Sequence, residues 1–105
     1  MERSLFDIQA EFCRAMGNAT RLQILHILRE RPMTVTEIML GLGLSQTMVS
    51  RQLAVLRSVS VVAGDRHGNE IVYHLTNEKI GEVCDLVRTV LVEQTQRQSN
   101  ALSDL

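Results

Sequence analysis

Apolar residues recur at helical spacing through the first part of the chain and predict successive helices. In the first helix, residues 4–16, the apolar stripe consists of Leu5, Ile8, Phe12 and Met16. Gly17 then ends this helix as a C-cap, and Asn18 is the N-cap of the next one. The second helix is apolar round nearly its whole circumference from Leu22 to Leu28, so we expect it to be buried on most sides and to end before Pro32.

Two further helices follow, and each begins at a polar cap. Thr34 and Glu37 have the spacing of a capping box, which opens a short third helix that reaches about Leu40. The next residues, two of them glycines, are expected to form a tight connection. Ser45 is the N-cap of the fourth helix, residues 46–57.

The fourth helix has two distinct faces when its residues are placed at about 100° intervals. The apolar side, which we expect to face the core, consists of Val49, Leu53 and Leu56. The opposite side consists of Thr47, Arg51, Ala54 and Ser58, flanked by Gln46 and Ser50. This outward side is small, hydrogen-bonding and cationic, with no acid and no bulky side chain.

After the fourth helix the hydrophobic period changes to two, which predicts strands at residues 61–66 and 70–75. His67-Gly68-Asn69 between them has the chemistry of a hairpin turn, because Gly and Asn tolerate positive φ. Asn77 can cap a last helix, whose apolar positions are Ile80, Val83, Val87 and either Val90 or Leu91. From Gln94 the chain is polar and is expected to fray. We therefore predict one domain over residues 1–95 and a polar C-terminal tail over residues 96–105.

This order of elements, ααααββα, predicts a mainly α protein with a small β-hairpin (α+β), a winged helix-turn-helix. The major groove of double-stranded DNA admits one helix, which must carry outward-facing donors, acceptors and cations. The hairpin tip would lie beside the duplex as a wing. The candidate DNA-binding residues are Ser45, Gln46, Thr47, Ser50, Arg51, Gln52, Arg66, His67 and Asn69. The alternative is that this polar face is simply solvated.

Composition narrows the classes of function. With 105 residues, 45% of them hydrophobic and 22% charged, the chain has room for one globular domain. The formal net charge of −1 excludes a binder that works by bulk positive charge, although it permits a local basic face. Aromatic residues are 3% of the chain, too few for stacking on single strands. No apolar stretch approaches the roughly 20 residues of a membrane helix, and no signal peptide is evident, so we expect a cytoplasmic protein without membrane contact.

The same residues resemble those of a known family. The segments GNATRLQIL at 17–25, TVTEI at 34–38, LGLSQ at 42–46 and VSRQLAVL at 49–56 are similar to those of the ArsR/SmtB family of winged-helix repressors. The resemblance implies a homodimeric bacterial repressor that dimerises through its first and last helices. It also implies DNA contacts from the fourth helix and the wing, and release from the operator when an effector binds.

The chain departs from the family pattern at several positions. Ala19 stands where Pro is frequent, Met39 where the residue is often small, and Gln52 where His is common. Val59-Ser60 replaces an Ala-Gly pair after the fourth helix. Gln52 retains hydrogen-bonding capacity, so DNA binding remains the expectation.

The metal sites of the family are not expected here. The third helix has no thiol, and the positions of the last-helix metal ligands hold Asn77, Lys79, Val90 and Glu93, of which the lysine would repel a cation. The histidines are scattered: we expect His26 to be packed in the second helix, His67 to face phosphate and His74 to be solvated. The prediction is therefore no metal and no cofactor.

The chain has two cysteines, Cys13 and Cys84, which are the candidate residues for sensing an effector. Each lies on a helix that the resemblance assigns to dimerisation, so the two thiols could meet and respond to oxidation or persulfidation. Family members that sense such species carry their first cysteine in the second helix, where this chain has His26. The alternatives are two small core residues without a redox role, or coordination of a metal by the thiols.

Three other functions compete with the thiol-regulated repressor. One is a repressor of the same family without an effector, and another is a winged helix used for protein–protein contact. An enzyme is not expected, because the acids are scattered and residues 41–43 lack the Gly and Lys that complete a phosphate-binding loop. Arg51 and Arg66 on the outward face favour DNA over a protein partner. The operator sequence and the regulated genes do not follow from the sequence.

Overall fold

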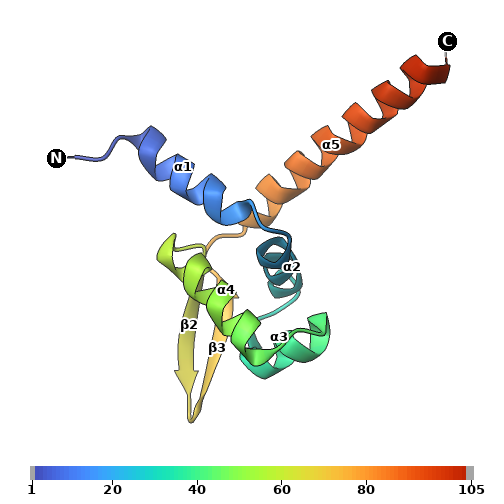
Figure 1. The fold of residues 1–105 in the computed structure, drawn as a ribbon. Helices are drawn as coiled ribbons and strands as arrows, with labels where there is room; N and C mark the ends of the chain where they lie inside the picture. The colour runs from blue at the N-terminus through green and yellow to red at the C-terminus, as the bar shows by residue number, and fades with distance from the viewer. Residues whose placement is uncertain (1, 104–105) are drawn as a thin grey trace.

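A computed structural model describes residues 2–103 and has the predicted order of elements with one additional short strand (Figure 1). The elements are α1 (Leu5–Met16), α2 (Ala19–Leu28), β1 (Met33–Thr34), α3 (Val35–Leu42), α4 (Gln46–Ser58), β2 (Val62–His67), β3 (Glu70–Leu75) and α5 (Lys79–Ser103). Helices α2, α3 and α4 and the sheet form a head, from which α1 and α5 project as two arms.

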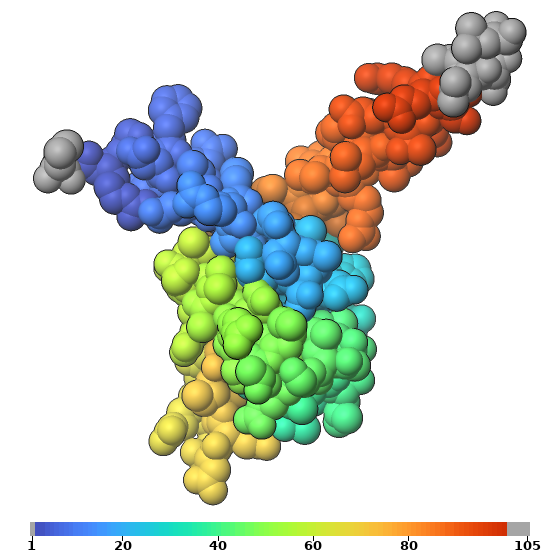
Figure 2. Space-filling model, in the orientation of Figure 1, coloured from blue at the N-terminus to red at the C-terminus, as the bar shows by residue number. Residues whose placement is uncertain are grey.

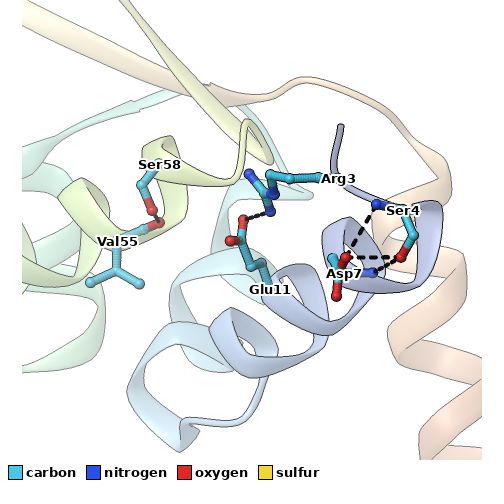
Figure 3. Close-up of polar contacts among 6 residues, drawn as sticks. All are labelled: Arg3, Ser4, Asp7, Glu11, Val55 and Ser58. Atoms are coloured by element: carbon cyan, nitrogen blue, oxygen red, sulfur yellow. Dashed lines mark hydrogen bonds and ion pairs between the residues drawn. The ribbon is translucent and has the colours of Figure 1, made fainter. Parts of the chain in front are cut away.

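The helix caps follow the local sequence. Ser4 and Asp7 form a reciprocal capping box at α1, with the Ser4 Oγ accepting from the Asp7 backbone N–H at 3.1 Å (Figure 3). Thr34 and Glu37 form a second capping box at α3. At α2 the Asn18 Oδ1 accepts a single hydrogen bond from the Arg21 backbone N–H at 3.0 Å. The predicted caps at Asn18 and Thr34 are confirmed, whereas the capping box at Ser4 was not predicted.

The core lies inside the head, between the helices and the sheet. Its most completely buried side chains are Ile24, Ile38, Val49, Leu53 and Leu56. The predicted inward face of α4 is therefore confirmed. The prediction for α2 was only partly right, because Ile24, Leu25 and Leu28 are buried whereas Leu22 is 41% exposed. His26 is also exposed, which corrects the expectation of a packed histidine.

The sheet is antiparallel with strand order β1-β3-β2. The predicted hairpin is present, with Val62 opposite Leu75 and His67 opposite Glu70. Gly68 has a positive φ of 63° at the turn, as the turn chemistry required. Strand β1 was not predicted, because its two residues join the sheet only through pairing with β3, where Met33 lies opposite Tyr73.

Two helices are longer than the sequence indicated. Helix α3 continues through Leu42 and ends at Gly43, which takes a left-handed conformation with φ of 67°. The predicted connection is therefore shorter than expected. Helix α5 continues beyond Gln94, where fraying was expected, as far as Ser103. No helix in the part of the chain that the structure describes is long and apolar enough to span a bilayer.

Both arms carry apolar side chains that the chain itself leaves uncovered. On α1, Leu5, Phe6 and Ile8 are 77%, 82% and 50% exposed. The large exposed apolar side chains of α5 are Val83, Leu86, Val87, Val90, Leu91 and Val92. Many large apolar side chains exposed on the same two helices are typical of an interaction face rather than of a solvated one.

The connection from α4 to β2 contains a backbone conformation that favours glycine. Ser60 has φ of 62°, in the left-handed region, and its carbonyl accepts a hydrogen bond from the Thr76 hydroxyl at 2.7 Å. Glycine would adopt this conformation without steric cost, and the family pattern that the sequence resembles has Gly at this position.

We predict that Ser60→Gly raises the free energy of unfolding by about 0.5–1 kcal/mol, because glycine adopts this conformation without the steric cost of a Cβ. Chemical denaturation followed by circular dichroism measures the change. Ser58→Gly, inside the last turn of α4, is the control and should lower the free energy of unfolding. Destabilisation by both substitutions would contradict the assignment of strain to Ser60.

Candidate nucleic-acid interface

Helix α4 lies uncovered at the surface of the head, with the hairpin beside it (Figure 2). The helix begins at Ser45, whose Oγ accepts a hydrogen bond from the Met48 backbone N–H at 3.1 Å. Burial of Val49, Leu53 and Leu56 fixes the rotation of α4 about its own axis. The outward side then consists of exposed residues: Gln46, Thr47, Ser50, Arg51, Ala54 and Ser58.

Arg57 is a second exposed cation of α4 and was not among the predicted DNA-binding residues. Its guanidinium carbon lies 5.9 Å from the centroid of the Tyr73 ring. This cation–π distance places Arg57 on the side of α4 that faces the hairpin. On the helical wheel it lies at the edge of the apolar side, and its contact partner is 16 residues away, so no local signal indicated its position.

The hairpin presents different chemistry on its two faces, because successive strand residues point in opposite directions. Arg66 lies opposite Ile71 and shares its face with Tyr73, the face toward α4. His67 lies on the other face, opposite Glu70 and two residues from Asp65. Of the two predicted wing residues in β2, Arg66 is therefore on the side of α4, whereas His67 lies opposite Glu70 on the other face. Asn69 is exposed in the turn.

Gln52, one of the predicted DNA-binding residues, lies beside the outward side of α4 and makes contacts within the chain. It is half-buried, and its Oε1 accepts a hydrogen bond from the Arg21 Nη1 at 2.8 Å. Its Nε2 lies 3.5 Å from the Met48 Sδ. Arg21 also donates through Nε to the Ala15 carbonyl at 2.6 Å, at the end of α1. The two side chains thus connect α1, α2 and α4.

His74 also differs from the expectation. Its side chain is 35% exposed rather than solvated, and its Nδ1 lies 3.3 Å from the Asp65 Oδ2. His26, His67 and His74 are on separate elements. Among residues 2–103, no three histidine, cysteine or acidic side chains come together as metal ligands.

Cys13 and Cys84 line the same groove, which has a volume of about 390 Å³ and is formed by α1, α2 and α5. Most of its lining is apolar, including Phe12, Leu22 and Leu91. Both cysteines are free thiols; Cys13 is exposed and Cys84 is partly buried. Burial raises the pKa of the Cys84 thiol, while nearby Arg29 and Arg88 act in the opposite direction.

Comparison with known proteins places the chain among bacterial regulators. Residues 18–63 match the family described as "Bacterial regulatory protein, arsR family". The HTH-type transcriptional regulator Rv0081 of Mycobacterium tuberculosis is 34% identical over 96% of this chain and 90% of its own length. The HTH-type transcriptional repressor SmtB of the same species is 32% identical over 77% of this chain and 60% of its own length.

Solved structures of such regulators share the fold. The crystal structure of Rv0081 superimposes with a TM-score of 0.81 and 33% identity, covering 92% of this chain and 98% of that one. The homodimeric winged helix-turn-helix DNA-binding domain Mb0332 of Mycobacterium bovis gives a TM-score of 0.79 at 30% identity, covering 89% of this chain and 86% of that one.

We predict that Gln52→Ala lowers the free energy of unfolding by about 1 kcal/mol, because it removes the acceptor of a partly buried hydrogen bond. In an Arg21→Ala background the same substitution should cost much less, since the bond is already absent. Denaturation of the two single variants and the double variant measures this coupling. Gln46→Ala, on the exposed side of the same helix, is the control and should be nearly neutral. Additive costs for Arg21→Ala and Gln52→Ala would contradict the direct contact.

Proposed function

Because this chain belongs to the arsR family of bacterial regulatory proteins, we propose that it is a homodimeric repressor that binds an inverted-repeat operator in double-stranded DNA. The single observation that carries the proposal is the outward side of α4. That side is exposed, bears Arg51 and hydrogen-bonding side chains, and includes no acid. It is held in place by a buried apolar side rather than by polar contacts that DNA would have to displace.

In this proposal α4 enters the major groove. Gln46, Thr47, Ser50 and Arg51 are short or flexible donors and acceptors suited to base edges, and Arg51 suits a guanine in particular. The helix N-terminus at Ser45 lies next to phosphate, where its free backbone N–H groups favour an anion.

The wing would contribute mainly through Arg66, on the hairpin face toward α4, with Asn69 at the tip. Arg57, between α4 and the hairpin, supplies a further phosphate contact. His67 is the weakest of the predicted contacts, because Glu70 lies directly across from it.

The second copy of this chain is the proposed occupant of the apolar faces of α1 and α5. The exposed apolar residues lie on these two arms, and the structurally similar domain Mb0332 is homodimeric. Two copies related by a dyad would present two α4 helices on one side of the duplex. Half-sites would then be separated by about 34 Å, one turn of DNA.

We further propose that oxidation or persulfidation at Cys13 and Cys84 releases the operator. The two thiols line one groove between the arms and α2, so a bond between them or a modification of either changes the surface on which the dimer packs. With a peroxide as oxidant, one thiol becomes a sulfenic acid as the peroxide O–O bond breaks and one equivalent of water or alcohol leaves. The second thiol then displaces water to form the disulfide.

We predict that Arg51→Ala weakens operator binding by about 1–3 kcal/mol, because a base contact in the major groove is lost. Fluorescence anisotropy measures this on a labelled duplex that the wild-type protein enriches from a random-sequence library. Arg66→Ala should instead weaken binding to all sequences alike and reduce the dependence on salt, as expected for a phosphate contact.

Arg31→Ala is the matched control, because Arg31 is exposed on the head and pairs with Glu37. It should leave the affinity unchanged. Unchanged affinity in Arg51→Ala would show that α4 does not enter the groove in the proposed way.

The thiol proposal predicts that treating the reduced protein with hydrogen peroxide or a persulfide donor weakens operator binding roughly tenfold, within the usual range for coupled sites. Cys13→Ser and Cys84→Ser should each remove the response to peroxide. Equal operator affinity of the reduced and the treated protein would reject thiol regulation and favour a repressor without this effector. Failure of the wild-type protein to enrich any DNA would favour the protein–protein interaction module instead.

A further inference from the structure

Helix α5 is joined to the head near its beginning and then leaves it (Figure 1). Ile80 is 7% exposed and belongs to the core, and Gly81 is also buried. Among the α5 side chains described from residue 82 to residue 100, Cys84 is partly buried and the others are exposed. The direction of the whole arm is therefore determined by its contacts in the first two turns.

One of these contacts is an ion pair between α2 and α5. Arg29, at the C-terminal end of α2, donates from Nη1 to the Asp85 Oδ1 at 2.8 Å and from Nη2 to the Asp85 Oδ2 at 3.0 Å. A planar guanidinium bound to both carboxylate oxygens fixes orientation as well as distance. Because both side chains remain partly exposed, the pair contributes little to stability, so its effect is on geometry.

Gly81 provides the surface on which the Arg29 side chain crosses α5. A Cβ at position 81 would overlap the Cδ, Nε and Cζ atoms of Arg29, which are the atoms nearest to that position. The absence of a side chain at position 81 thus lets Arg29 lie against the helix and reach Asp85, one turn further along. Glycine is otherwise unfavourable inside a helix relative to alanine.

We propose that Arg29, Gly81 and Asp85 form a clamp that sets the angle of α5 and thereby determines which spacing between operator half-sites the dimer accepts. This inference rests on the proposed dimeric function. Helix α5 has 25 residues and is about 37 Å long, so a change of about 10° at its base moves its far end by about 6 Å. That displacement exceeds the rise of about 3.4 Å per base pair, so the clamp has enough leverage to change the half-site spacing.

The clamp also lies at the groove that holds the thiols. Arg29, Gly81, Cys84 and Asp85 all line it, and Cys84 is the immediate neighbour of Asp85. A modification of Cys84 would therefore act next to the contact that orients the arm. The same clamp then connects the proposed effector site with operator selection.

The test is a selection from a library of random-sequence duplexes, followed by sequencing. Wild-type protein and the variants Arg29→Ala, Gly81→Ala and Arg31→Ala are compared. Sedimentation and circular dichroism verify that each is dimeric and folded. Arg31→Ala is the matched control, because Arg31 lies two residues from Arg29 and pairs with Glu37 rather than with α5. Gly81→Ala changes no charge and favours the helix, so any effect on spacing would come from displacement of the Arg29 side chain.

We expect all four proteins to enrich the same half-site. Wild type and Arg31→Ala should enrich it with one spacing, whereas Arg29→Ala and Gly81→Ala should accept additional spacings, lowering the preference for the wild-type spacing roughly fivefold. The same single spacing in the two clamp variants would overturn the proposal while leaving the dimeric repressor intact. If the wild-type protein enriches no inverted repeat, the proposed function fails, and the clamp proposal fails with it. Should Arg29→Ala fail to fold or dimerise, Gly81→Ala decides the outcome.

Discussion

The rotation of α4 about its own axis is the constraint on which the rest of the structure depends. Burial of Val49, Leu53 and Leu56 against the core fixes this rotation, because turning the helix would expose apolar surface worth several kcal/mol. Arg51 is then directed outward, away from the core. Arg57 is placed toward the hairpin, and Gln52 toward α2. The burial of one apolar side of α4 therefore determines the direction in which each of its polar side chains points.

The sequence predicted the features that short-range chemistry determines. The N-caps at Asn18, Thr34 and Ser45 each depend on a side chain and a backbone N–H three residues apart, so they were predicted correctly. Strand β1 was missed because its formation depends on pairing with β3, about 40 residues later. The extension of α5 was missed because its polar composition after Gln94 gives no periodic signal.

At the candidate site, the sequence predicted which side chains are exposed better than it predicted which other side chains they contact. Arg51 and Arg66 lie on the expected sides, since their positions follow from helical and strand periodicity. Gln52 was predicted as a DNA-binding residue, but its contact with Arg21 could not be predicted, because Arg21 is on another helix. The His26 side chain was expected to be buried, because α2 is apolar round nearly its whole circumference. That helix is instead open on the side of the groove, and the apolar side chains of the arms beside it are exposed in the part of the chain that the structure describes.

The most direct test of the central claim is methylation interference at guanine N7 on a duplex enriched by the wild-type protein. Guanine N7 faces the major groove, so a methyl group there blocks a side chain that reads the base edge. If α4 of each subunit lies in the major groove, interference should occur in two symmetry-related clusters about one helical turn apart. Binding that is insensitive to N7 methylation would contradict the account, because it would place the contacts of α4 outside the major groove.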